Sequence, residues 1–277
     1  MDELQDRLAR IGLGSLGEYG FALAGGYALQ AHGLVQRVSE DVDLFTDRWD
    51  VQDFAHAVEA VRRAYEQAGM VVVVARQADT FARLQVTDQD SDQVAMVDLA
   101  ADFREREPVQ LSIGPVLAER DAVAAKTAAT FSRGEARDYL DLAGILASGH
   151  YSQEELIALA AQSDAGFDRA IFAEALAGVD RFPDRAFARY GAEAGEIARV
   201  RATMRDWSRG LAEKADSQAT TPSGRQSPRL DGLPQDVDSP GERSHQAGPY
   251  RRVPGSSRHG DGRDVGFDGP APAGPRR

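Results

Sequence analysis

Two aspartates separated by one residue could bind a divalent cation. Asp41 and Asp43 belong to the segment Asp41–Phe45, which we interpret as a strand. Side chains at positions i and i+2 of a strand point to the same side of a sheet, so both carboxylates are expected on one surface. Gathering two carboxylates is costly unless a cation or hydrogen-bond donors meet their charge. The pair is a candidate Mg²⁺ site, although an isolated pair of this kind is more often solvated or caps a loop.

A pair of glycines precedes these aspartates. Gly25 and Gly26 follow a short apolar strand that ends at Ala24, and a helix is predicted from about Tyr27 to His32. Glycines that open a helix let backbone N–H groups and the helix dipole face an anion. The glycine turn would suit phosphate and the aspartates would suit Mg²⁺, which together are what nucleotidyl transfer requires. Taken alone, a glycine pair more often marks only a turn.

Three later positions could complete such a site. Asp98 lies near the end of a predicted strand, Gln93–Leu99, and could be a third metal-binding carboxylate from a neighbouring strand. An ordinary strand-end aspartate explains it equally well, and Asp102 is the second choice because it falls beyond the strand. Lys126 is one of only two lysines and stands in an otherwise apolar helix. A compact positive charge suits a phosphate, although a surface lysine would also fit.

An acidic pair follows in the next predicted helix, in the sequence Arg137-Asp138-x-x-Asp141. The two aspartates are three residues apart and are therefore neighbours on one helical face. From the residues alone, these three side chains would most often form a salt-bridge network at the surface.

The order of these motifs resembles the nucleotidyltransferase superfamily, most closely the AbiEii/AbiGii toxin family that includes the MenT toxins. The first motif of that family looks like GG-x-AL followed by R-x-S-x-D-x-D-L/F, and a lysine helix followed by R-D-x-x-D comes later. The matching positions of the first motif are Gly25, Gly26, Ala28, Leu29, Arg37, Ser39, Asp41, Asp43 and Leu44. Lys126 and Arg137-Asp138-x-x-Asp141 match the later one. The match to the family's (K/R)-x-E motif is incomplete, and Arg104 or Arg106 could supply it.

The resemblance implies an enzyme that moves a nucleoside monophosphate from an NTP to an acceptor with the help of Mg²⁺. Asp41 and Asp43, with Asp98, would hold two metal ions, and Asp138 would be the general base or another catalytic carboxylate. The residues that would bind the NTP are Gly25, Gly26, Arg37, Ser39 and Lys126. By the same resemblance, the acceptor would be the 3′ end of a tRNA, and the protein would be a toxin with a separately encoded antitoxin.

Two other functions are consistent with parts of the sequence. Aminoglycoside nucleotidyltransferases share a GG-x-A…D-x-D-L opening, and an acidic protein suits a cationic drug better than it suits tRNA. The later Lys126 and Arg137-Asp138-x-x-Asp141 set favours the toxin. A non-catalytic binding protein on the same fold is the third interpretation, and the intact Asp41/Asp43 pair argues against it.

The composition narrows the class of protein. The 277 residues carry a net charge of −12, so any nucleic acid must bind to a local arginine patch and not to the overall field. No cysteine is present, which excludes disulfides, cysteine nucleophiles and thiolate metal sites. No apolar run reaches the roughly 18 residues of a membrane span, and the acidic N-terminus does not resemble a signal peptide. We therefore expect no membrane association and a cytoplasmic location.

The pattern of elements predicts an α+β fold, with a nucleotidyltransferase-like mixed sheet followed by helices. We expect a catalytic α/β part over residues 1–115 and a helical part over 116–215 that contributes to the site. The sheet part would include a buried strand over Met70–Ala75. In residues 216–277, proline and glycine fill 19 of 62 positions, so this segment is predicted to be a disordered tail.

Overall fold

The computed structural model describes residues 3–37 and 39–219, with side chains described up to residue 214. These residues belong to one unit of the chain, 1–223. The elements are α1 (Glu3–Ser15), η1 (Gly17–Tyr19), β1 (Ala22–Leu23), α2 (Gly25–Ala31), β2 (Asp41–Thr46), α3 (Val51–Gln67), β3 (Met70–Ala78), β4 (Phe81–Asp88), β5 (Val94–Ala101), β6 (Val109–Leu111), β7 (Gly114–Val116), α4 (Glu119–Ser132), α5 (Ala136–Ala147), α6 (Gln153–Ser163), α7 (Arg169–Ala177), η2 (Gly178–Arg181), α8 (Asp184–Ala188) and α9 (Ala194–Ala219).

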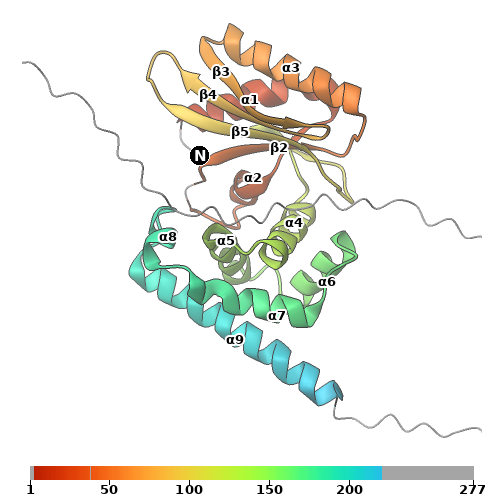
Figure 1. Cartoon of the computed structure of the whole chain (residues 1–277), viewed down its shortest axis with the longest axis vertical. Coiled ribbons are helices and arrows are strands. Elements are labelled where there is room, and N and C mark those ends of the chain that lie inside the picture. The colour runs from red at the N-terminus through yellow and green to blue at the C-terminus, as the bar shows by residue number, and fades with distance from the viewer. Residues whose placement is uncertain (1–2, 38, 220–277) are drawn as a thin grey trace, which may run out of the picture. The chain divides into compact units, whose positions relative to one another are not determined.

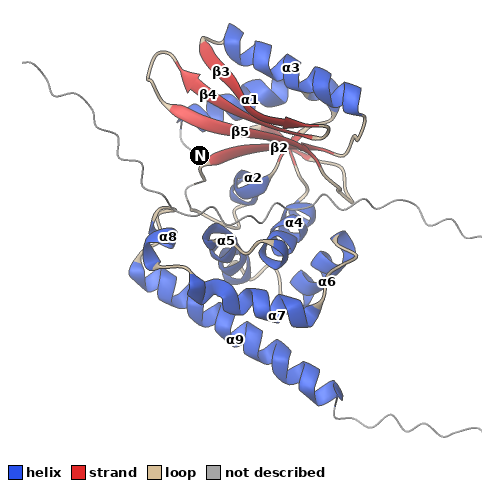
Figure 2. Cartoon of the chain, in the orientation of Figure 1, coloured by secondary structure: helices blue, strands red, loops and turns tan. Residues whose placement is uncertain are grey.

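The described strands form one mixed sheet in the order β3-β4-β5-β2-β1-β7-β6. The β2/β5 and β1/β7 pairs are parallel, and the other pairs are antiparallel. Helices follow the last strand, as Figure 2 shows. The predicted α+β class is confirmed. Its division at residue 115 into two parts coincides with the end of the sheet and stays a prediction.

The two faces of the sheet differ in what covers them. Every second residue of β2, β4 and β5 is buried on one face, and most of these residues are apolar, including Val42, Leu84 and Val97, which are 0% exposed. This face packs against α1 and α3, while α2, α4 and α5 lie on the other side (Figure 1). The period-two alternation therefore places Asp41 and Asp43 on the face that looks toward α2, α4 and α5.

Helix α4 is the central element of the helical half, because it contacts α2, α5, α6 and α7. Around it the core is aromatic: Phe172 packs edge-on against Trp207 with ring centroids 5.2 Å apart. Large fully buried aromatic side chains stabilise such packing, each by roughly 1.5–3 kcal/mol. Lys126 on α4 and Asp138 on α5 are therefore held on rigid supports.

Local signals account for several helix ends. A capping box begins α6, since Ser152 and Glu155 each accept from the other's backbone N–H. Asp50 caps α3 by accepting from the backbone N–H groups of Gln52 and Asp53. At the other end of α3, Gly69 adopts a positive φ of 82°, as expected for a glycine that ends a helix. Helix α2 begins at Gly25, two residues before the predicted start.

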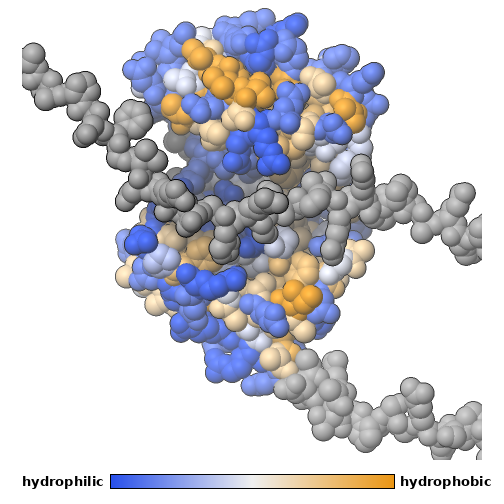
Figure 3. Space-filling model, in the orientation of Figure 1, coloured by the Kyte–Doolittle hydropathy of each residue, from blue (hydrophilic) through white to orange (hydrophobic). Residues whose placement is uncertain are grey.

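The prediction of a buried strand over Met70–Ala75 was wrong in its burial. The strand is longer, and it lies at the edge of the sheet with only β4 beside it. Met70 is buried, but Val71 and Val73 are 45% and 53% exposed. They lie on the face opposite α1 and α3, and Figure 3 shows apolar surface over this part of the sheet. The β-branched run reports strand propensity, whereas burial depends on which elements cover each face.

Two further differences concern short or terminal elements. The β6–β7 hairpin was not predicted, because strands of three residues are too short to show an alternating pattern. Helix α9 continues to Ala219, four residues into the predicted tail, and no proline interrupts it before Pro222. The rest of the predicted tail, from residue 220, lies outside the described residues. In the described part of the chain, no helix is both long and apolar enough to cross a membrane.

Candidate active site

Three carboxylates share the face of the sheet that looks toward the helices. Asp41 and Asp43 lie on β2, and Asp98 lies on β5, where it pairs directly with Asp43 in the parallel register. The intervening residues Val42 and Val97 are fully buried on the opposite face. Parallel pairing of the two strands thus brings Asp98 beside the Asp41/Asp43 pair, although 55 residues separate it from Asp43 in the sequence.

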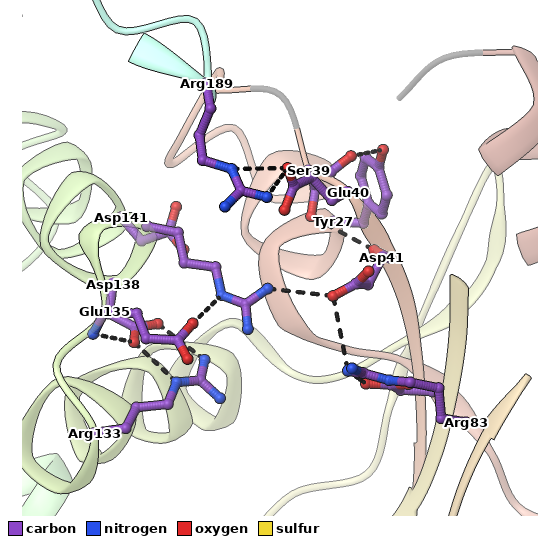
Figure 4. A network of polar contacts seen from close by, with 12 residues as sticks. Tyr27, Ser39, Glu40, Asp41, Arg83, Arg133, Glu135, Asp138, Asp141 and Arg189 are labelled. Atoms are coloured by element: carbon purple, nitrogen blue, oxygen red, sulfur yellow. Dashed lines mark hydrogen bonds and ion pairs between the residues drawn. The ribbon is translucent and has the colours of Figure 1, made fainter. Parts of the chain in front are cut away.

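Arginines neutralise two of these carboxylates. Arg83 on β4 binds both oxygens of Asp98 at 2.7 and 2.5 Å, and lies 3.9 Å from Asp41. Arg137 on α5 reaches Asp41 at 3.2 Å. Figure 4 shows Asp41 between Arg83 and the helices that carry Arg133 and Asp138. The sheet and the helical half are therefore joined by ion pairs at this point.

Asp43 differs from its two neighbours. Among the described residues, its carboxylate has no hydrogen bond or ion pair. Burial, followed by the negative charge of Asp98, raises the pKa of Asp43 to about 6. A bound cation would stabilise the ionised form of this carboxylate, and hard cations such as Mg²⁺ prefer carboxylate oxygens as ligands. The chemistry of the acidic wall, which we define as Asp41, Asp43 and Asp98, thus fits a divalent ion.

The glycine pair lets other side chains approach the backbone. Gly25 has a φ of +58°, and a Cβ there would lie 1.9 Å from an oxygen of Asp43. A Cβ at Gly26 would lie 2.8 Å from Arg37 and 3.0 Å from the hydroxyl of Ser39. Any other residue at position 25 would have to adopt a left-handed conformation and displace the Asp43 carboxylate. The pair is therefore required for packing around the acidic wall, whatever else its N–H groups bind.

A positively charged wall lies opposite the acidic one, with side chains from α4 and its C-cap, from α5 and from the loop before β2. Lys126 is 6% exposed and binds Asp138 at 3.0 Å and Asp141 at 2.9 Å. Arg37 binds both oxygens of Asp141, at 2.6 and 2.7 Å. Burial opposes the charge of Lys126, but Asp141 and Asp138 outweigh it and raise the pKa of the amine. We define the basic wall as Arg37, Lys126, Arg133 and Arg137.

Asp138 and Asp141 do not form the surface salt-bridge network that the bare sequence suggested, because both are 0% exposed. Asp138 accepts from Lys126, twice from Arg133, and from the backbone N–H of Glu135 in a capping box at the start of α5. These four donors fill the lone-pair sites of the carboxylate. Burial works against ionisation, but the charges of Lys126 and Arg133 hold the pKa of Asp138 well below its ordinary value. Such a carboxylate suits the positioning of cations better than proton abstraction.

A single cavity of about 400 Å³ is enclosed by the two walls. Its polar lining comes from both, and Asp138 and Asp141 stand behind the basic wall. The polar residues that line it are Arg37, Ser39, Asp41, Asp43, Arg83, Asp98, Asp102, Lys126, Arg133 and Arg137, with Gly25 and Gly26 beside them. The structure thus brings together every predicted site residue except Asp138, which contacts the site through Lys126. Their roles stay predictions. In the described part of the chain, no three His, Cys, Asp or Glu side chains already form a metal-binding group.

Comparison with known protein families identifies the chain. Residues 8–231 match the family described as "Nucleotidyl transferase AbiEii toxin, Type IV TA system". The chain belongs to the AbiEii nucleotidyltransferase toxin family. The match covers more than the region of the sequence motifs, because it includes all of the described elements from the middle of α1 onward.

Three solved structures are similar to this AbiEii protein at low identity. They are a candidate nucleotidyltransferase from H. pylori (16% identity, 79% of this chain and 99% of that chain, TM-score 0.48), JHP933 from Helicobacter pylori (18%, 79% and 96%, 0.45) and MenT4, the nucleotidyltransferase toxin Rv2826c of Mycobacterium tuberculosis H37Rv (20%, 79% and 93%, 0.41). No curated protein sequence matches the chain. The family assignment rests on the family match alone.

Sequence reasoning missed two arginines of this AbiEii site. Arg83 lies directly opposite Asp98 in the antiparallel β4/β5 pair, so the pairing register would have revealed it. Arg133 lies one turn before Asp138, just ahead of α5, and contacts it. Arg104, a candidate for the (K/R)-x-E motif, instead binds the carbonyl of Gly20 at 3.0 Å and Asp47 at 2.6 Å.

The buried ion pairs predict how acid affects the stability of this AbiEii protein. Because the pKa of Asp138 is lowered in the fold, its contribution to stability is present above the ordinary aspartate pKa of 3.8 and is lost progressively as the pH falls below that value. At pH 7, Asp138→Asn should be less stable than wild type by about 3 kcal/mol. This difference should shrink between about pH 4 and pH 3.

Urea unfolding at several pH values measures this difference. Asp180→Asn is a suitable control, since Asp180 makes a similar two-point contact with Arg205 but is 42% exposed. Its effect should stay below about 1 kcal/mol. A constant gap between wild type and Asp138→Asn down to pH 3 would show that Asp138 does not have a lowered pKa.

Proposed function

We propose that this protein transfers a nucleoside monophosphate from an NTP to an acceptor hydroxyl, with release of pyrophosphate, in a Mg²⁺-dependent reaction. The observation that supports it most is the single cavity with an acidic wall on the sheet and a basic wall on the helices. A metal-bound triphosphate carries both signs of charge, and such a cavity matches both. Family membership supports the reaction class.

Asp41 and Asp43 would hold the metal ions, with Asp98 as the third carboxylate and Asp102 as the second choice for it. Bound Mg²⁺ would neutralise the triphosphate and favour ionisation of the attacking hydroxyl. In the structure, Arg83 forms an ion pair with Asp98, and Arg137 forms an ion pair with Asp41. Both arginines would have to exchange these contacts for phosphate oxygens when the nucleotide binds.

Lys126 and Arg133 would bind the phosphates from the helical side. The N–H groups of Gly25 and Gly26 and the hydroxyl of Ser39 face the same cavity and could donate to phosphate oxygens. Arg37 is held by Asp141 and packs over the ring of Tyr190, so its guanidinium is fixed in position. We assign Asp138 to the positioning of Lys126 and Arg133, because its four donors leave it no free oxygen lone pair for a substrate proton.

The acceptor and the biological role are part of the same proposal, and the family resemblance supports them. We propose the 3′ end of a tRNA as the acceptor, a separately encoded antitoxin as the partner, and the cytoplasm as the site of action. The family description, a toxin of a type IV toxin–antitoxin system, supports a role in toxicity. Arg133 of the basic wall is 46% exposed and could contact RNA from within a chain of net charge −12.

Incubation of the purified protein with each α-labelled NTP, Mg²⁺ and bulk tRNA tests this function. Label is expected in the RNA, and Asp41→Ala should lose it while keeping a wild-type circular dichroism spectrum. Equal transfer by Asp41→Ala would refute the acidic wall as the reaction site. Transfer to an aminoglycoside and not to RNA would favour the antibiotic-modifying alternative, which the acidic net charge supports.

A further inference from the structure

A second cavity lies next to the first and has no assigned ligand. It has a volume of about 430 Å³, within the range of small-molecule sites. Ala125 and Asp102 line both cavities, so the two share a wall. On the α4 side the new cavity is lined by Ala124, Ala125 and Ala128, whose small side chains leave the space open. A molecule in this cavity would lie beside the bound nucleotide.

The charged residues that line this cavity are all acidic. They are Asp102, Glu105 and Asp121, with no lysine, arginine or histidine among the described lining residues. Asp121 is already used, since it accepts from the backbone N–H groups of Glu105 and Arg106 at 3.2 and 3.0 Å. The carboxylate of Glu105 makes one long ion pair, with Arg106 at 4.0 Å, among the described residues. Asp102 accepts only from the backbone N–H of Phe103, at 2.8 Å, among the described residues, so both Glu105 and Asp102 keep free oxygen lone pairs.

The remaining lining is mostly apolar, with Gln162 and Ser163 as its uncharged polar members. Leu159 on α6 is buried, and Phe103 is 63% exposed. An exposed aromatic ring beside a wall of alanines offers a surface on which a planar or cyclic ligand can stack. A phosphate would be repelled here, whereas an amino group could donate hydrogen bonds to the carboxylates. The cavity thus selects against anions and for amino donors.

We propose that this second cavity binds the reacting unit of the acceptor and recognises it through an amino group, either the exocyclic amine of a nucleobase or the amine of an amino sugar. This proposal rests on the proposed nucleotidyl transfer and specifies the acceptor for it. The acceptor's hydroxyl would enter the first cavity past Ala125 and Asp102. Its phosphates, where it has any, would lie outside the acidic pocket.

Two neighbouring alanines provide a matched test. Ala128 lines only the second cavity and Ala129 only the first, and both are half-buried on α4. Ala128→Leu should raise the acceptor KM at least tenfold and leave NTP affinity unchanged. Ala129→Leu should instead weaken NTP binding, measured by calorimetry with MgNTP. If Ala128→Leu weakens NTP binding and spares the acceptor, the second cavity holds the nucleobase of the donor and our assignment is wrong.

A second test uses acceptors that differ only in the amino group. Cytosine presents an amine where uracil presents a carbonyl, and Asp and Glu accept from that amine. Wild type should bind a 5′-labelled oligonucleotide ending in C about tenfold more tightly than one ending in U, the loss expected when one hydrogen bond to a charged acceptor is not made. Glu105→Gln, on an exposed loop, should reduce this preference toward one, because an amide can donate to uracil.

The binding measurement separates this proposal from the proposed function. Absence of transfer by wild type, with preserved C-over-U binding that Ala128→Leu removes, would refute the reaction and retain the cavity assignment. Binding of an amino sugar but of neither oligonucleotide, lost in Ala128→Leu, would support the cavity and identify the source of the amine as a small molecule. Equal binding of C- and U-ended oligonucleotides and no binding of the amino sugar would overturn the proposal.

Discussion

Replacement of Asp43 by asparagine is expected to abolish nucleotidyl transfer and, at the same time, to make the metal-free protein more stable. Asp43 has no partner among the described residues, and it stands beside Asp41 and Asp98. Its ionised form is unfavourable in the fold, as the pKa of about 6 against an ordinary 3.8 indicates. The residue that the reaction needs as a charged ligand is therefore one that the fold tolerates poorly.

The size and the pH dependence of this effect follow from linkage. One pKa unit corresponds to about 1.4 kcal/mol, and the side chain is only partly buried, so the expected gain at pH 7.5 is about 1–3 kcal/mol. Because the pKa is raised, the folded state binds the proton more tightly than the unfolded state. Asp43 therefore makes the stability of wild type decrease as the pH rises from about 4 to about 6, and Asp43→Asn should lack this decrease.

Urea unfolding in the presence of a chelator at pH 4.5 and pH 7.5 measures the difference. Asp90→Asn, in an exposed turn, makes the same chemical change without burial and should shift stability by less than about 0.5 kcal/mol. Addition of Mg²⁺ should stabilise wild type and not Asp43→Asn. Loss of stability in Asp43→Asn at pH 7.5 would show that the carboxylate has a compensating partner and that the acidic wall does not need a cation.

The sequence predicted the site best where residues that could bind phosphate or a metal ion also lie in a clear turn or strand pattern. The Gly25-Gly26 pair and the Asp41/Asp43 alternation lie within one stretch, so their common location follows from local geometry. The family resemblance added Lys126 and Asp138 to the predicted site. Nothing in the sequence around these two residues links them to the strand that carries Asp41 and Asp43. The cavity that Lys126 shares with the aspartates of β2 depends on the packing of α4 against α2 and α5, which no local pattern specifies.

Other features depend on non-local pairing and were missed or misjudged. Arg83 acquires its partner only when β4 pairs with β5, and burial of the valines of β3 depends on whether a helix covers that face. The burial of Asp138 and Asp141 was also unexpected, because charged residues on a helix usually face solvent. Here the cations that offset them come from two distant segments of the chain: the loop before β2, which carries Arg37, and α4 with its C-cap, which carry Lys126 and Arg133.

Removal of the buried amine should have the largest effect on stability. Asp138 and Asp141 are 0% exposed, and each has an oxygen within 3.0 Å of the Lys126 amine. In Lys126→Met, both carboxylates therefore stay buried with one fewer cation beside them. Loss of one member of a buried ion pair typically costs about 3–5 kcal/mol, because the charge left behind cannot be hydrated. We expect a loss of this size at pH 7.

The only other lysine of the chain provides the control. Lys214 binds Glu154 at 2.8 Å but is 62% exposed, so Lys214→Met should cost less than about 1 kcal/mol. Lys126→Met combined with Asp138→Asn should lose less than the sum of the two single changes, by more than about 1 kcal/mol, because the pair is in direct contact. Urea unfolding of the four variants and wild type measures both quantities. Additive losses would mean that Lys126 and Asp138 are not coupled, and that the basic wall is not built on the buried carboxylates behind it.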